Sequence, residues 1–172
     1  AVLMLFAVTA FLSMWISNTA TAAMMLPLAM GMMSHLDQEK ERKTYVFVLL
    51  GIAYCASIGG LGTVVGSPPN MIAAKALNLD FVGWMKLGLP MMLLILPLML
   101  FSMYVILKPN LNERVEVKEE SIPWTLHRVI ALLIFLAAAV AWVFSSKIKE
   151  AFGISNPDTV IALIAAVAVV VF

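Results

Sequence analysis

The chain has 172 residues, of which 63% are hydrophobic and 12% charged, with a mean hydropathy of +1.01 and a net charge of +1. Soluble domains are about half apolar and about a quarter charged, so this composition excludes a soluble domain and indicates an integral membrane protein in contact with the lipid bilayer. The basic residues are scattered in short loops, and we expect no nucleic-acid partner. Both ends fall inside apolar stretches, and we expect an internal piece of a longer protein.

Residues 1–34 contain two apolar stretches, 1–16 and 20–34, on either side of the polar cluster Ser17-Asn18-Thr19. Each stretch would be roughly 22 Å long as a helix, which is shorter than a hydrocarbon core of about 30 Å. We therefore predict a re-entrant helical hairpin whose tip lies near the middle of the bilayer. The alternative is an ordinary span that runs through the cluster, with the Ser and Thr hydroxyls bonded to the preceding turn.

A second irregularity follows the charged loop at 35–43. The apolar sequence predicts a helix over 44–58, which is interrupted at 59–70 by GGLGTVVGSPPN and resumes to complete a broken helix over 44–79. Four glycines and two adjacent prolines within this stretch prevent a regular helix. Because the first half is too short to cross a bilayer, the break is predicted at the same depth as the hairpin tip.

The rest of the chain alternates apolar and polar segments. It predicts an interfacial segment at 81–88 with Trp84 as an anchor, full spans at 88–107 and 124–146, and a further span from Thr159. Polar loops separate these spans at 108–123 and 147–158. Seven Lys and Arg residues lie on the side of the loops 35–43 and 108–123, against four on the other side, which predicts that these two loops are cytoplasmic in a multi-pass plasma (inner) membrane protein.

The two breaks predict a site for an anion and a cation. Where a helix resumes, after Asn18-Thr19 and at about Asn70, its first N–H groups are free and suit a carboxylate or another oxyanion. Thr19 and Asn70 are also residue types favoured as N-caps. Where a helix stops, free carbonyls and neutral side-chain oxygens suit a hard cation such as Na⁺.

The positions of the acidic residues, outside the apolar segments, favour sodium rather than protons as the coupling ion. All ten Asp and Glu residues lie in polar loops or at interfaces, whereas proton relays need an ionisable group inside the membrane. A site without fixed charge lets an anionic substrate and a bound cation offset one another. The sequence contains no His-Glu-x-x-His motif and no Cys/His ligand set, and we expect neither an enzyme nor an organic cofactor.

The sequence SNTATAAMMLP at 17–27, followed by GGLGTVVGSPPN at 59–70, resembles the divalent anion:sodium symporter family, whose members carry di- and tricarboxylates. The resemblance implies an all-α inverted-repeat transporter that works as a homodimer by an elevator motion. It places 1–80 in the transport domain, 81–158 in connector and scaffold or arm helices, and 159–172 in the truncated start of a further transmembrane helix.

The resemblance also implies roles for individual residues. The residues assigned to substrate binding are Ser17, Asn18, Thr19, Ser67 and Pro68. Those assigned to Na⁺ are Ser13, Ser17, Asn18 and the carbonyl of Gly66. Those assigned to supporting the loop are Gly62, Thr63 and Asn70.

The predicted function is sodium-coupled symport of di- or tricarboxylate anions such as succinate, malate or fumarate. One alternative is a symporter of sulfate or another oxyanion, and another is a cation/proton antiporter of related architecture. A membrane scaffold without transport activity is a further alternative, although it would not explain glycine-rich backbone in the middle of the bilayer.

Overall fold

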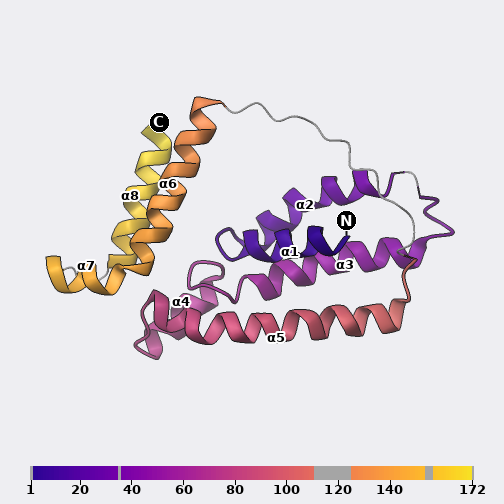
Figure 1. The fold of residues 1–172 in the computed structure, drawn as a ribbon, viewed down its shortest axis with the longest axis horizontal. Coiled ribbons are helices and arrows are strands. Elements are labelled where there is room, and N and C mark those ends of the chain that lie inside the picture. The colour runs from indigo at the N-terminus through magenta and orange to yellow at the C-terminus, as the bar shows by residue number, and fades with distance from the viewer. Residues whose placement is uncertain (1, 35, 111–124, 154–156, 172) are drawn as a thin grey trace. The chain divides into compact units, whose positions relative to one another are not determined.

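The computed structural model describes residues 2–34, 36–110, 125–153 and 157–171, and every regular element within these ranges is an α-helix (Figure 1). The predicted all-α fold class is therefore confirmed. Two compact units are present, and each is described by itself: residues 1–77 with 84–118, and residues 78–83 with 119–172. Most of the predicted polar loop 108–123 lies outside the described residues.

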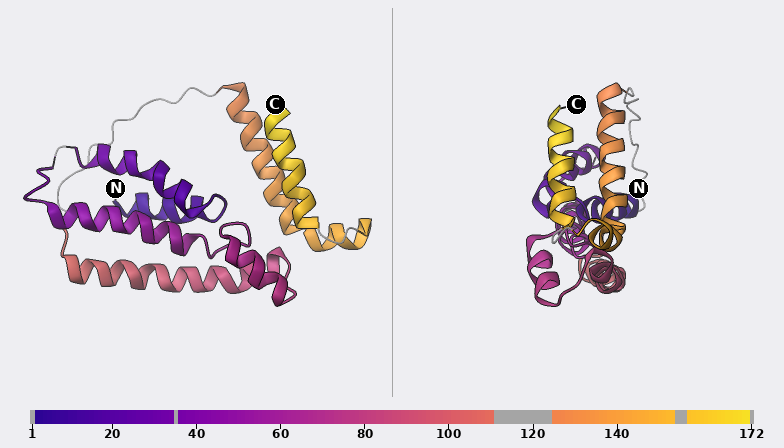
Figure 2. Two further views of the ribbon diagram at one scale, coloured as in Figure 1. Left: turned by 180° about the vertical axis from the view of Figure 1, so that it is seen from behind. Right: turned by 90° about the vertical axis from the view of Figure 1, so that its left-hand side faces the viewer.

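The first unit begins with the predicted helical hairpin. Helix α1 (Val2–Ser13) and helix α2 (Asn18–Met32) are joined by the turn at 14–17, and both pack on helix α3 (Arg42–Gly59). The start of α2 lies beside the end of α1, and at its other end Tyr45 Oη donates a hydrogen bond of 2.8 Å to the Met33 carbonyl near the start of α3. Helix α2 therefore runs back along α3, which excludes a single span through the cluster (Figure 2).

Helices α1 and α3 run parallel at close range because glycine lines their contact. A Cβ atom at Gly51 would lie 2.2 Å from Phe6 Cζ, and one at Gly59 would lie 2.3 Å from the Ala10 carbonyl oxygen. Successive residues of α1 thus meet successive residues of α3 in the same direction. Both helices consequently end at the same end of the unit, where the hairpin turn and the glycine-rich loop also lie (Figure 1).

Behind this contact lies an apolar core to which four helices contribute. The Phe6 and Phe47 rings meet edge to face, with their centroids 5.6 Å apart. Other buried members come from α2 and α3, and Met103 comes from helix α5 (Phe81–Leu107). The buried residues are Leu5, Phe6, Ala10, Met25, Ala29, Met33, Phe47, Val48, Ile52, Cys55 and Met103.

The predicted broken helix is also present. Helix α3 ends at Gly59, and helix α4 (Pro68–Ala76) begins two residues before the predicted restart at Asn70. The earlier start has a physical reason: proline fixes φ near the helical value, and its missing N–H is not needed in the first turn. Pro68 and Pro69 therefore form the first two positions of α4 instead of belonging to the loop.

Helix α5 is a single continuous helix, so the segment 81–88 that was predicted as interfacial is the first part of the same helix as the predicted span 88–107. Trp84 Nε1 donates a hydrogen bond of 3.0 Å to the Leu61 carbonyl in the glycine-rich loop. Gly88 packs on the same carbonyl, since a Cβ there would lie 2.3 Å from its oxygen. Among the described helices, α5 is the one that is long and apolar enough by itself to cross a membrane.

The second unit contains helix α6 (Leu126–Val143), helix α7 (Ser145–Phe152) and helix α8 (Pro157–Val171). The predicted span 124–146 ends at Val143, where the chain bends by 71° into α7. The predicted loop at 147–158 is thus wrong over α7, which ends at Gly153 in the left-handed conformation with φ of 65°. The charged residues of this segment suggested a loop, although they lie on a short amphipathic helix.

Candidate functional site

The end of α1 meets the start of α2 and the last turn of α3 at Ser13. This buried side chain has its Oγ atom 2.7 Å from Asn18 Oδ1 and 2.6 Å from the Ala56 carbonyl oxygen. A serine hydroxyl has one proton and can donate to only one of these two oxygens at a time. The Ala56 carbonyl also accepts a hydrogen bond of 3.1 Å from Gly60 N–H. The three neutral oxygens of Ser13, Asn18 and Ala56 thus converge, and such oxygens suit a small, hard cation.

The glycine-rich loop packs directly on this cluster. A Cβ at Gly66 would lie 2.6 Å from the Gly60 carbonyl oxygen and 2.9 Å from that of Ser13. A Cβ at Gly60 would lie 2.3 Å from Asn18 Oδ1. Gly66 thus lies beside Ser13. The cluster also contains Gly60 and Ala56, which were not among the residues assigned to Na⁺ from the sequence. Gly60 had a signal in its glycine run, but Ala56 had none, because it acts through a carbonyl that every residue has.

The chemistry of the oxygen atoms in this cluster fits Na⁺ as a ligand. All of the converging atoms are neutral oxygens from hydroxyl, amide and carbonyl groups, which suit hard cations better than transition metals. No group of three His, Cys, Asp or Glu side chains within the described ranges could hold a metal ion. The helices α1 to α4 also contain no Asp or Glu.

Thr63 and Asn70 hold the loop in place. The buried Thr63 Oγ1 donates a hydrogen bond to the Met14 carbonyl at the hairpin turn and accepts one of 3.1 Å from Gly66 N–H. Asn70 Nδ2 donates to the carbonyls of Gly60, at 2.7 Å, and Thr63, at 2.8 Å. Asn70 is therefore not the N-cap of α4. It lies inside the first turn of this helix, and its side chain hydrogen-bonds the glycine-rich loop.

These contacts give a stability prediction for the full-length protein. Thr63→Val is expected to lower its free energy of unfolding by about 1–3 kcal/mol, because the buried Gly66 N–H loses its acceptor. Thr63→Ser keeps the hydroxyl and is expected to retain most of the stability. Thermal unfolding of both purified variants in detergent checks this difference, and equal melting temperatures would contradict it.

The start of α2 provides the anion-binding side of the candidate site. Its N-cap is Ser17 rather than Thr19, and Ser17 Oγ accepts a hydrogen bond of 3.3 Å from Ala20 N–H. The N–H groups of Asn18 and Thr19 have no partner among the described residues, and the Thr19 side chain is exposed. Free N–H groups and the positive end of the helix dipole together suit a carboxylate.

The start of α4 is different. Its N-cap Ser67 has extended backbone and makes no side-chain cap bond, and Pro68 and Pro69 have no N–H group to offer. Asn70 N–H donates to the Ser67 carbonyl at 3.0 Å. The expectation of free N–H groups at this restart is therefore wrong, and α4 can act on an anion there only through its dipole and the half-buried Ser67 side chain.

Gly62 lies between the hairpin and α5. A Cβ at this position would lie 3.0 Å from Met14 Cγ and 3.2 Å from Met92 Sδ. Flexible methionine side chains thus fill the space on both sides of the loop. The hairpin turn, the loop and α5 form one packed cluster within the first unit.

A hairpin and a broken helix that end together, with neutral oxygens and a free helix N-terminus at the junction, define a membrane transporter with discontinuous helices. The family model described as citrate transporter (CitMHS) matches residues 1–172, and the chain belongs to this family. Family members are transporters and not enzymes. The predictions that the protein is a transporter and that it is not an enzyme are therefore confirmed, as is the resemblance to the carrier family.

Individual relatives agree with this membership. The chain is 52% identical over 177 residues to a protein of Haemophilus influenzae described as an uncharacterized transporter, which covers 98% of the chain and 38% of the relative. It is 27% identical to the sodium-dependent dicarboxylate transporter SdcS of Staphylococcus saprophyticus, over 78% of the chain and 30% of the relative. It is also 27% identical to a low-affinity phosphate transporter of Saccharomyces cerevisiae, over 94% of the chain and 18% of the relative. The chain thus spans less than two fifths of the length of these relatives.

Proposed function

We propose that the protein carries di- or tricarboxylate anions, such as succinate, malate or fumarate, by sodium-coupled symport across the plasma membrane. The observation that carries this proposal is the position of Ser13 Oγ between two acceptor oxygens, Asn18 Oδ1 and the Ala56 carbonyl. Na⁺ is a co-transported substrate in this proposal. The sodium-dependent dicarboxylate transporter among the relatives supports the same pairing of ion and substrate.

The proposed coupling is electrostatic. Na⁺ would bind the oxygens of Ser13 and Asn18 together with the backbone of the glycine-rich loop. The substrate carboxylate would bind the free N–H groups of Asn18 and Thr19 on the adjacent side, with Ser17, Ser67 and Pro68 lining its site. Because the surrounding helices have no acidic side chain, each ion stabilises the other, and each binds more tightly when the other is present.

The proposal extends to how the multi-pass carrier moves as a whole. We assign residues 1–80 to a transport domain that slides in an elevator motion within a homodimer. In this assignment Gly62, Thr63 and Asn70 keep the loop seated on the hairpin while the domain moves. The loops 35–43 and 108–123 lie on the cytoplasmic side.

A second candidate function is transport of an inorganic oxyanion. The relative described as a phosphate transporter covers 94% of the chain, which supports this alternative specifically. A helix N-terminus binds phosphate and carboxylate by the same N–H groups. The described residues therefore suit either anion, and the two functions must be separated by measurement.

The test is uptake of labelled succinate by the full-length protein in proteoliposomes, with either Na⁺ or K⁺ outside. We expect uptake with Na⁺ only, and competition by unlabelled malate or citrate but not by phosphate. Phosphate uptake that succinate does not inhibit would favour the second candidate. Succinate uptake that is equal with Na⁺ and K⁺ would overturn the sodium coupling.

A further inference from the structure

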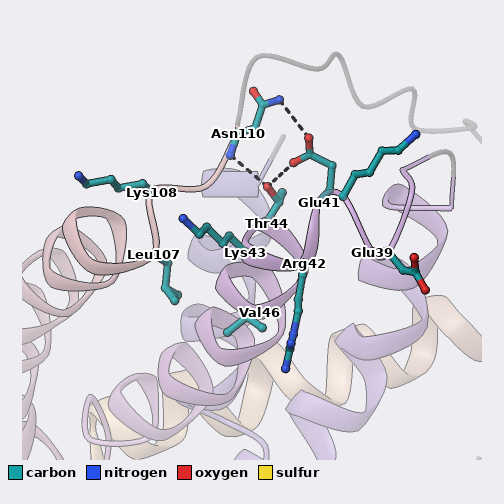
Figure 3. Close-up of a pocket in the computed structure, with 10 residues that line it drawn as sticks. Glu39, Glu41, Arg42, Lys43, Thr44, Val46, Leu107, Lys108 and Asn110 are labelled. Carbon is teal, nitrogen blue, oxygen red and sulfur yellow. Dashed lines mark hydrogen bonds between the residues drawn. The ribbon is translucent and has the colours of Figure 1, made fainter.

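A cavity lies at the other end of the first unit, away from the candidate site. It has a volume of about 380 Å³ and forms where the start of α3 meets the end of α5. Its lining comes from residues 39–44 and Val46 on one side and from Leu107, Lys108 and Asn110 on the other. Two parts of the chain that are distant in sequence thus enclose one space (Figure 3).

The cavity has an excess of positive charge. Its lining contains four cationic side chains and two carboxylates. One carboxylate, Glu41, already accepts hydrogen bonds from Thr44 Oγ1 at 3.0 Å and from Asn110 Nδ2 at 3.4 Å. Lys40 pairs with Asp37 at 3.4 Å. The remaining cations, Arg42, Lys43 and Lys108, have no ion pair in the part of the chain that the structure describes.

Two of these cations, Lys43 and Lys108, lie on the same side of the cavity. Figure 3 shows the side chains of Lys43 and Lys108 extending to one side of the cavity, away from the hydrogen-bonded Glu41 and Asn110. Both lysines are exposed and come from different segments. Two such ammonium groups suit a phosphate, which accepts charge-assisted hydrogen bonds from both.

An apolar surface adjoins the two lysines. Lys108 directly follows the last residue of the long apolar helix α5, and Val46 and Leu107 form the apolar part of the cavity lining. Val105 and Ile106 precede Leu107 on α5, and their side chains are 50% and 76% exposed. A ligand that fits both features has a phosphate group joined to a hydrocarbon chain, which is the chemistry of a phospholipid.

We propose that this cavity binds the headgroup phosphate of an anionic phospholipid between Lys43 and Lys108, with an acyl chain along the exposed face of α5. The net positive lining favours an anionic headgroup over a zwitterionic one. The exposed apolar residues next to the lysines favour a lipid over free inorganic phosphate. The cavity is separate from the candidate sodium and carboxylate site, because the cavity lies at the start of α3 and the candidate site lies where α1 and α3 end.

The test uses the full-length protein purified in detergent and titrated with phosphatidylglycerol, phosphatidylcholine or inorganic phosphate, with native mass spectrometry reporting bound lipid. The variant is Lys43→Gln/Lys108→Gln. The matched control is Lys147→Gln/Lys149→Gln, which removes the same charge from α7 in the other unit. At about fivefold for each lysine near a lipid surface, the first variant is expected to bind phosphatidylglycerol roughly 30-fold more weakly, and the control about as well as the unmodified protein.

Three outcomes would overturn the proposal. Equal phosphatidylglycerol binding by the two variants would remove the lysine pair from the site. Equal retention of phosphatidylcholine and phosphatidylglycerol would remove the preference for an anionic headgroup. Displacement of the lipid by millimolar inorganic phosphate would identify a soluble anion as the ligand. An unchanged melting temperature of the lysine variant in detergent without lipid shows that its fold is intact.

Discussion

Asn18→Ala is expected to abolish sodium-dependent uptake by the full-length carrier while leaving its amount in the membrane unchanged. The substitution removes the oxygen that lies 2.7 Å from Ser13 Oγ and next to Gly60. Loss of one hydrogen-bonding partner of a charged ligand costs about 1.5–3 kcal/mol, which corresponds to an affinity roughly ten- to a hundredfold weaker for the ion. Because the substrate depends on the ion, uptake is expected to fall further than sodium binding alone.

Asn110→Ala is the matched control for this experiment. It also removes an amide whose side chain is hydrogen-bonded, 3.4 Å from Glu41, but at the other end of the first unit. We expect it to retain succinate uptake. Normal uptake by Asn18→Ala, measured at equal membrane levels of the two variants, would contradict the assigned site.

Gly66→Ala is expected to have the second large effect. The added methyl group would lie 2.6 Å from the Gly60 carbonyl oxygen and 2.9 Å from that of Ser13. Both neighbours are backbone atoms, so the loop must move away from the hairpin, and overpacking of this kind costs about 1–3 kcal/mol. We expect loss of uptake together with a lower melting temperature of the full-length protein.

The control for this prediction is Gly31→Ala, at an exposed position on α2. A methyl group there meets no atom within 4 Å, and alanine is favoured over glycine in a helix by about 1 kcal/mol. Uptake and stability are expected to be kept or slightly raised. Equal behaviour of the two glycine variants would show that the close approach at Gly66 is not needed.

The sequence predicted both helix breaks because each is encoded locally. Polar residues at Ser17-Asn18-Thr19 and glycines and prolines over 59–70 interrupt apolar helices wherever they occur. The exact helix starts were less predictable. Ser17 and Ser67 are the N-caps, whereas Thr19 and Asn70 were expected, because neighbouring residues of similar capping preference cannot be ranked without the path of the backbone.

Contacts between distant segments could not be read from the sequence. The Ala56 carbonyl approaches Ser13 only because glycines allow α1 and α3 to pack closely, and this depends on the register of two helices. Trp84 is a similar case, since its indole N–H reaches Leu61 in the loop and the residue fits an interfacial anchor equally well by composition. The end of the span was predicted at 146, close to the end of α6 at Val143, but the bend into α7 follows no glycine or proline and was not predicted.

The proposed sodium site is tested by sodium binding to the purified full-length carrier without substrate, measured as the shift in melting temperature with Na⁺ against K⁺. We expect Na⁺ alone to stabilise the unmodified protein, and Ser13→Ala to lose this shift. Ser57→Ala, which removes a hydroxyl bonded 3.0 Å to the Ala53 carbonyl of its own helix, is expected to keep it. An equal sodium shift in all three proteins would contradict the proposed sodium site, because the ion would then bind without the Ser13 oxygen.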